Sequence, residues 1–304
     1  MNRKIIRQGK GGYTIYLPKK WVDSKGLKAG DQVSLVESDN TLLIGSHAKE
    51  RKEKTIRITE ENKKDIKNIL THLYRNGFDS ITITDIDDQL LDEIKGATSL
   101  LLGFEVTERD AKQCRIENIS EPTEQKYDVL LRRNFLIIKD TQNIILKDFE
   151  DENFKNLREI EELRNQQDKF ILFCRRILAK EKYERNPLTG WELLTFLMHI
   201  EHAYYYLYKY AAESNMKKNR EAVELLKELG GYFDLLYDAN FKREIRNIHK
   251  INSLKNKFQF GKCLALIEKS EGKDSVVFSY IRELFRLIQL ATSPILSEII
   301  ESEI

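Results

Sequence analysis

The N-terminal segment constrains the fold most, because short apolar stretches alternate with glycines over very little chain. A basic stretch, 3–7, precedes glycines at positions 9, 11 and 12, and a second apolar stretch follows at 13–17. Glycine adopts the backbone angles of tight reversals without steric cost. The pattern therefore predicts two short strands joined by a glycine-rich turn.

The next residues complete a small unit. Pro18 suits the first turn of a short helix, where its missing N–H costs nothing. The stretches 32–36 and 41–44 have the spacing of a hairpin. So few apolar residues cannot form a core that is stable alone, so we expect residues 1–46 to oligomerise.

Positive charge is concentrated in this unit. Residues 1–30 contain eight lysines and arginines against one acid, Asp23, although the whole chain carries a net charge of only +2. A basic module on a mildly acidic body is typical of a nucleic-acid reader. The candidate DNA-binding residues are Arg3, Lys4, Arg7, Lys10, Lys19 and Lys20.

Two motifs give this unit a family resemblance. Leu17-Pro18-Lys19-Lys20-Trp21 is followed by Gly26-Leu27-Lys28-Ala29-Gly30-Asp31. In this order and spacing they resemble the SpoVT-AbrB (MazE-like) DNA-binding domain. The resemblance implies a swapped-hairpin β-barrel formed by two chains, hence a homodimer that binds double-stranded DNA. We expect Arg3 and Arg7 to read bases or a groove, and the lysines to contact phosphates.

A polar linker at 46–54 leads to a predicted small α/β domain, 54–120. Apolar residues alternate in four short stretches and recur at helical spacing in two others. No paired acids at a strand end and no phosphate-binding glycine loop mark a catalytic centre. We interpret the domain as a spacer or a sensor of an unidentified ligand, and the protein as no enzyme.

The remainder of the chain, 121–304, has helical periodicity throughout. The predicted class is therefore multidomain α+β with an all-α C-terminal domain. Six helices are expected, at about 124–148, 151–181, 189–214, 218–239, 241–260 and 274–302. Thr189-Gly190-Trp191-Glu192 fits a capping box at the start of the third.

Helices one to three and four to six look like two copies of one unit. The segments at 198–203 (Met-His-Ile-Glu-His-Ala) and 286–291 (Arg-Leu-Ile-Gln-Leu-Ala) fit one template. It resembles a segment of the PhoU family, whose fold is two tandem three-helix bundles. Together with the N-terminal unit, the chain resembles archaeal PhoU-type regulators, which implies a link to phosphate uptake or signalling.

The resemblance also raises the question of metal binding, because PhoU proteins hold iron or zinc clusters with acidic ligands. Here Asp168 fits one acid, but Arg164 stands where its partner should be. Glu201 and Gln289 replace the later acids of the two repeats. A guanidinium repels a cation, so we expect the cluster to be lost and no cofactor to be bound, with Asp168 and Glu201 as a remnant.

Two other groups on the third helix invite functional readings. His199 and His202 flank Glu201 and could ligate a metal, or could make polar contacts within the bundle. The tyrosines at 204, 205, 206, 208 and 210 could stack on bases, or could pack between helices. For the histidines, polar contacts within the bundle are favoured as the commoner case. For the tyrosines, packing is favoured, because five aromatic residues within seven positions cover every side of the helix, so that some must lie in the core and some at an interface.

The chain's environment is indicated by its cysteines and its hydropathy. Cys114, Cys174 and Cys263 lie far apart and lack metal-ligand spacing, which indicates reduced thiols. No run of about 18 apolar residues marks a membrane span. We expect a cytoplasmic protein without membrane insertion.

Three functions remain open at this point. The first is a dimeric DNA-binding transcriptional regulator with a PhoU-like effector domain. The second is a phosphate-signalling adaptor whose helical domain binds a transporter or kinase and whose barrel only dimerises. The third is a MazE-like antitoxin, which the long helical C-terminal region makes the least favoured.

Overall fold

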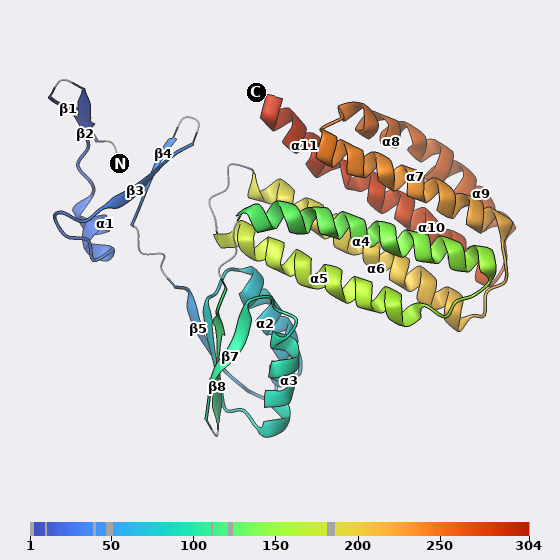
Figure 1. Cartoon of the computed structure of the whole chain (residues 1–304), viewed down its shortest axis with the longest axis horizontal. Coiled ribbons are helices and arrows are strands. Elements are labelled where there is room, and N and C mark those ends of the chain that lie inside the picture. The colour runs from blue at the N-terminus through green and yellow to red at the C-terminus, as the bar shows by residue number, and fades with distance from the viewer. Residues whose placement is uncertain are drawn as a thin grey trace. The chain divides into compact units, whose positions relative to one another are not determined.

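The computed structural model describes residues 3–9, 11–38, 41–46, 51–110, 112–120, 124–180 and 186–303 of the 304-residue chain. Its class is mixed α+β with a large C-terminal helical region, as predicted (Figure 1). The chain divides into two compact units, the first ending at Arg51 and the second beginning at Lys52. The division falls inside the predicted linker.

The first unit consists of two separate strand pairs and one helix. In chain order these are β1 (Ile6–Gln8), β2 (Gly12–Thr14), α1 (Lys19–Ser24), β3 (Val33–Ser38) and β4 (Thr41–Ser46). β1 pairs antiparallel with β2, and β3 with β4. Gly9 follows β1 with φ +65°, a conformation that glycine adopts without strain. The described residues form no closed barrel.

The start of α1 differs by one position from the prediction. Pro18 is the N-cap, and the helix begins at Lys19. The carbonyl of Pro18 accepts the backbone N–H groups of Trp21 and Val22 at 2.9 and 3.1 Å. Pro18 has extended backbone angles (φ −62°, ψ 124°), so it precedes the helix instead of forming its first turn.

The second unit begins with a four-stranded sheet. Its strands are β5 (Glu53–Arg57), β6 (Ser80–Thr84), β7 (Phe104–Arg109) and β8 (Gln113–Asn118), in the order β5-β6-β8-β7. β5 and β6 are parallel, as a connection through a helix allows, and the other pairings are antiparallel. The 3₁₀ turn η1 (Lys63–Asp65) and helices α2 (Ile66–Arg75) and α3 (Asp88–Thr98) complete this part.

Alternation along the central strands determines which face of the sheet is buried. Ile81 and Ile83 of β6 are fully buried, as are Cys114 and Ile116 of β8, whereas Thr82 between the isoleucines is only partly buried. Both α2 and α3 lie on one face of the sheet (Figure 1). The predicted alternation of apolar and polar residues therefore separates the face of the sheet that the helices cover from the face that they leave uncovered.

Eight helical segments and a π-helical turn make up the rest. They are α4 (Glu124–Asp151), α5 (Leu157–Lys180), α6 (Pro187–Glu213), α7 (Arg220–Lys242), α8 (Ile245–Lys257), η2 (Phe258–Lys262), α9 (Cys263–Lys269), α10 (Lys273–Leu290) and α11 (Thr292–Glu303). α4, α5 and α6 pack on one another, α10 packs on α6 and α7, and α4 also contacts α7. The long helices lie side by side in one bundle (Figure 1).

Three local predictions for the helices were wrong. The helix predicted at 241–260 continues to Lys269 through the π-helical turn η2. Glycine fits this turn, because a Cβ on Gly261 would lie 2.8 Å from the carbonyl oxygen of Asn256. The helix predicted at 274–302 breaks at Ala291, three residues before Pro294, whose ring clashes with the carbonyl four residues earlier. The helix predicted from Thr189 begins at Pro187.

The sheet part and the bundle are joined by a buried ion pair within the second unit. The Arg176 guanidinium on α5 is fully buried and donates to Asp79 Oδ1 at 2.8 Å and to the carbonyls of Tyr74 and Phe78. Lys180 also pairs with Asp79. Burial opposes ionisation of Asp79, but bonds from Lys180 and the Lys52 N–H, together with both positive charges, lower its pKa overall.

The cysteines are as expected from the sequence. Cys114, Cys174 and Cys263 are free and buried, and burial raises the pKa of Cys114 to about 11. No helix among the described residues is long and apolar enough to cross a membrane.

Candidate functional site

The predicted DNA-binding side chains all lie in the first unit. Lys10 falls outside the described residues, and the other five are exposed: Arg3, Lys4, Arg7, Lys19 and Lys20. Arg7 is on β1, directly opposite Tyr13 of β2 in the register. Lys19 and Lys20 open α1. The described candidates thus occupy a strand, its leading segment and a helix start, and solvent reaches each of them.

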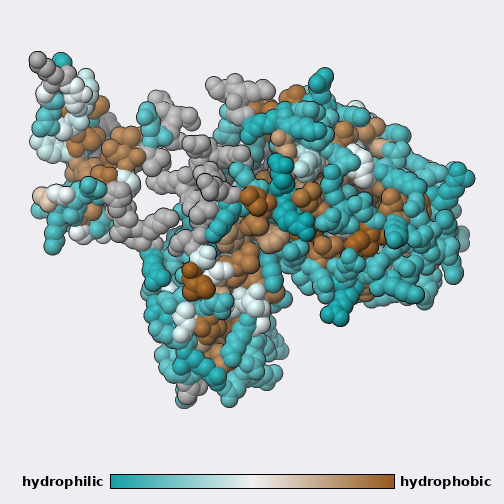
Figure 2. Space-filling view, viewed as in Figure 1, coloured by the Kyte–Doolittle hydropathy of each residue, from teal (hydrophilic) through white to brown (hydrophobic). Residues whose placement is uncertain are grey.

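The apolar side chains of this unit are exposed as well. None of the side chains that the structure describes between residues 3 and 46 is buried. Large hydrophobic residues with at least two-fifths of their surface exposed are Ile5, Ile6, Tyr13, Ile15, Tyr16, Leu35 and Leu42. Figure 2 shows hydrophobic residues on the visible surface of this unit. The described side chains of one copy of this unit therefore form no buried core.

The second hairpin shows where apolar residues gather. In the β3–β4 register Leu35 lies opposite Ile44, and Glu37 opposite Leu42. Opposed residues of an antiparallel pair share a face, as do residues two apart. Leu35, Leu42 and Ile44 therefore share one face, and Leu35 is 60% exposed. Such a face is suited to covering by another apolar surface.

The two acids of the predicted metal remnant bind different partners. An Asp168 oxygen lies 3.0 Å from His202 Nε2, whereas Glu201 Oε1 accepts the Thr141 hydroxyl at 2.7 Å. Glu201 is fully buried, and burial raises its pKa to about 8, against the effect of the Thr141 bond. Arg164 stacks on Tyr205, with Cζ 4.1 Å from the ring centroid.

These residues do not fit a metal cluster. A carboxyl that is neutral near neutral pH is a poor cation ligand, and a guanidinium one helical turn from Asp168 repels a cation. Across the described ranges, no group of three or more histidines, cysteines and acids is arranged to hold a metal ion.

Three of the five tyrosines of α6 pack inside the bundle, in agreement with the packing interpretation. Tyr204, Tyr205 and Tyr208 are buried, whereas Tyr206 is 48% exposed. Gln142 donates to the Tyr204 hydroxyl at 2.7 Å, and Tyr208 donates to Asp148 at 2.5 Å. Buried tyrosines with satisfied hydroxyls cannot stack on bases.

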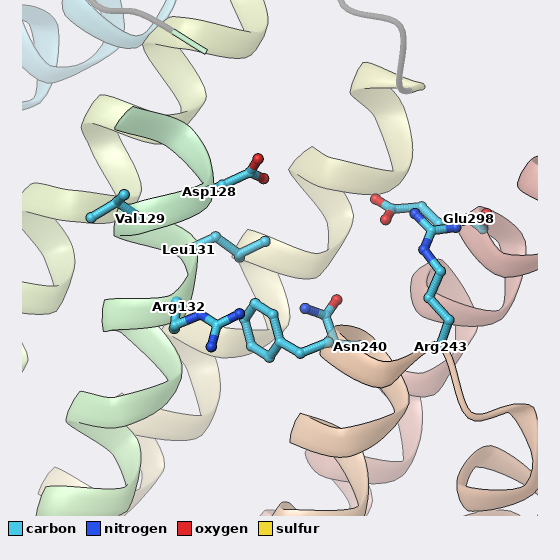
Figure 3. A pocket seen from close by; sticks show the side chains of 8 residues that line it. Asp128, Val129, Leu131, Arg132, Asn240, Arg243 and Glu298 are labelled. Carbon is cyan, nitrogen blue, oxygen red and sulfur yellow. Dashed lines mark hydrogen bonds between the residues drawn. The ribbon is translucent and has the colours of Figure 1, made fainter. Parts of the chain in front are cut away.

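The helical part has a cavity of about 410 Å³ between α4, the end of α7 and α11 (Figure 3). Asp128 and Arg132 project from α4, Arg243 lies at the end of α7, and Glu298 belongs to α11. The Arg132 guanidinium stacks on Phe241 at 4.6 Å, and Arg243 donates to the Glu298 carbonyl at 3.4 Å. The lining carries two acids and two arginines, so its formal charge is balanced.

Comparisons with known proteins add no assignment: no family model, curated protein or solved structure matches this chain.

Proposed function

We propose that this protein is a dimeric DNA-binding transcriptional regulator. Residues 1–46 of two copies interleave into one swapped-hairpin barrel, and the helical part, a PhoU-like pair of three-helix bundles, acts as the effector domain. The observation that carries this proposal is the first unit itself, which exposes both its apolar side chains and its basic ones.

A second copy of the same unit is the partner that best explains the exposed apolar residues. Unpaired hairpins with apolar faces are unstable in water, since a two-stranded ribbon buries too little surface. An identical copy supplies the same two hairpins and the same apolar residues, so each chain completes the core of the other. The resemblance to the SpoVT-AbrB domain favours this arrangement.

The charge of the unit supports DNA as the ligand. The five described candidate residues are all exposed, and Asp23 is the single acid among residues 1–30. Lysines and arginines gain affinity for a duplex by releasing its condensed counterions. A dimer doubles the number of such contacts and presents them with twofold symmetry. The link to phosphate uptake or signalling rests on the PhoU resemblance.

DNA binding is tested by the salt dependence of affinity for mixed-sequence duplex DNA, measured by fluorescence anisotropy. In the variant R7A/K19A/K20A we expect weaker binding and a log–log salt slope that is smaller by up to about 0.9 per lost phosphate contact. The matched control K64A/K67A/K217A removes three exposed charges from the second unit. Unchanged affinity of the first variant at moderate salt would contradict the assignment.

Dimerisation is tested separately, by sedimentation of the variant L35S/L42S. The wild-type protein should sediment at twice its 35.8 kDa chain mass, and the variant at the chain mass. A wild-type monomer contradicts the barrel. A dimer that binds no DNA contradicts the regulator and favours the second candidate, the phosphate-signalling adaptor that binds a transporter or kinase.

A further inference from the structure

Two arginines from different parts of the second unit stack on one tryptophan. The Cζ atom of Arg75, the last residue of α2, lies 5.7 Å from the ring centroid of Trp191 on α6. The Cζ atom of Arg175 on α5 lies 5.1 Å from the same centroid. The ring therefore holds two like charges at the junction of α2, α5 and α6.

Arg175 has no carboxylate partner, although it is buried to 4% exposure. It donates to the Thr195 hydroxyl at 2.8 Å. The Nε atoms of Arg75 and Arg175 are both buried without a hydrogen-bond partner, as are those of Arg164 and Arg176. Among the described residues, no acid forms an ion pair with either guanidinium. Such groups are costly to bury unpaired, so a missing anion is the simplest account of both.

The neighbouring arginine differs in having a carboxylate partner. Arg176, next along α5, bonds the carboxylate of Asp79 and two backbone carbonyls. The acid whose charge acts on Arg175, Asp168, is paired with His202. Burial and the charge of Arg75 lower the pKa of Arg175 to about 10, against a smaller opposite effect of Asp168.

We propose that Arg75 and Arg175 bind a small oxyanion bearing a phosphate group beside Trp191. Two guanidiniums match a doubly charged tetrahedral anion in charge, and each presents several N–H donors to its oxygens. Arg75 is only partly buried and His72, 2.8 Å from its terminal nitrogen, is exposed, so solvent reaches the Arg75 side of the pair. All these residues lie outside residues 1–46, so the site is independent of DNA binding.

The site can be tested with the fluorescence of Trp191. The chain has two tryptophans, Trp21 and Trp191, so W21F leaves Trp191 as the single reporter in the full-length protein. Inorganic phosphate is titrated against chloride at constant ionic strength, and a phosphomonoester is titrated in parallel. We expect a saturable change with phosphate, and at least about a tenfold loss of affinity in R75Q and in R175Q.

The control variant R158Q removes an exposed arginine of the same helix, whose side chain is 91% exposed, and should bind like W21F. Saturation by the phosphomonoester alone assigns the site to a phosphorylated molecule instead of free phosphate, and supports the proposal. The absence of any saturable change overturns it.

A second measurement separates binding from packing, in case R175Q does not fold. Phosphate should raise the midpoint of thermal unfolding of W21F and leave that of R75Q unchanged, because a ligand stabilises the state that binds it. A purely structural stack predicts that R75Q lowers the midpoint equally with and without phosphate, and that phosphate does not stabilise W21F. That result overturns the proposal.

Discussion

The two units of this chain solve the problem of burying apolar surface in opposite ways. In the second unit, Ile81, Phe135 and Phe285 are fully buried, and most long helices contribute to one continuous core. In the first, no described side chain is buried. The difference teaches that the second unit has a core of its own, whereas the described side chains of the first unit leave their apolar surface uncovered.

The largest expected effect concerns the ion pair that joins the sheet part to the bundle. D79A leaves the fully buried Arg176 without its carboxylate, which should cost about 3–5 kcal/mol in the free energy of unfolding. Urea unfolding followed by circular dichroism measures the loss. If the sheet and bundle were independent, D79A would unfold only the sheet and a second transition would remain.

A surface pair provides the control for this experiment. In E162A the partner left behind is Arg158, whose side chain is 91% exposed. The free energy of unfolding should change by no more than about 0.5 kcal/mol.

The second effect is spread over several pH units and tests whether water reaches the buried Glu201. Glu201 has a pKa of about 8 in the folded protein and an ordinary value of 4.5 when unfolded. Between these values the folded state binds more protons, so stability falls as pH rises, by up to about 1.4 kcal/mol per pH unit. E201Q should remove this slope, measured as the free energy of unfolding from pH 5 to pH 8. Parallel curves for the two proteins would show that water reaches Glu201.

The smallest effect concerns the start of α6. The Asn186 side chain accepts the Leu188 N–H at 3.0 Å, so N186A should cost about 1 kcal/mol. Thermal unfolding of N186A and E192A, compared side by side, distinguishes this cap from the predicted capping box. A larger loss of thermal stability in E192A than in N186A would support the predicted capping box instead.

The periodicity of the sequence correctly predicted those features of the fold that depend on contacts between nearby residues. The alternation at β6 and β8 and the 3.6-residue period of the bundle located the strands and helices, because each depends on residues nearby in the chain. The predicted start of α6 was wrong. Thr189 and Glu192 fit the capping-box pattern, but Asn186 is the N-cap and Pro187 takes the first helical position, which proline favours.

Long-range contacts could not be predicted in the same way. Asp79 and Arg176 are 97 positions apart, and the sequence around either residue does not predict that the other is its partner. One signal did exist: Arg175 and Arg176 interrupt an apolar run from Ile171 to Leu178, and a buried arginine there needs an anion. For one arginine the chain supplies it, and for the other we infer an external one.

The bond between Arg176 and Asp79 also has a practical meaning for anyone dividing this protein. A fragment that starts at the first bundle helix would expose Arg176 and the apolar residues around it, and should be prone to aggregation. Expression of separate pieces is better begun at Lys52, where the two compact units part. The recombinant helical piece should therefore carry its sheet along.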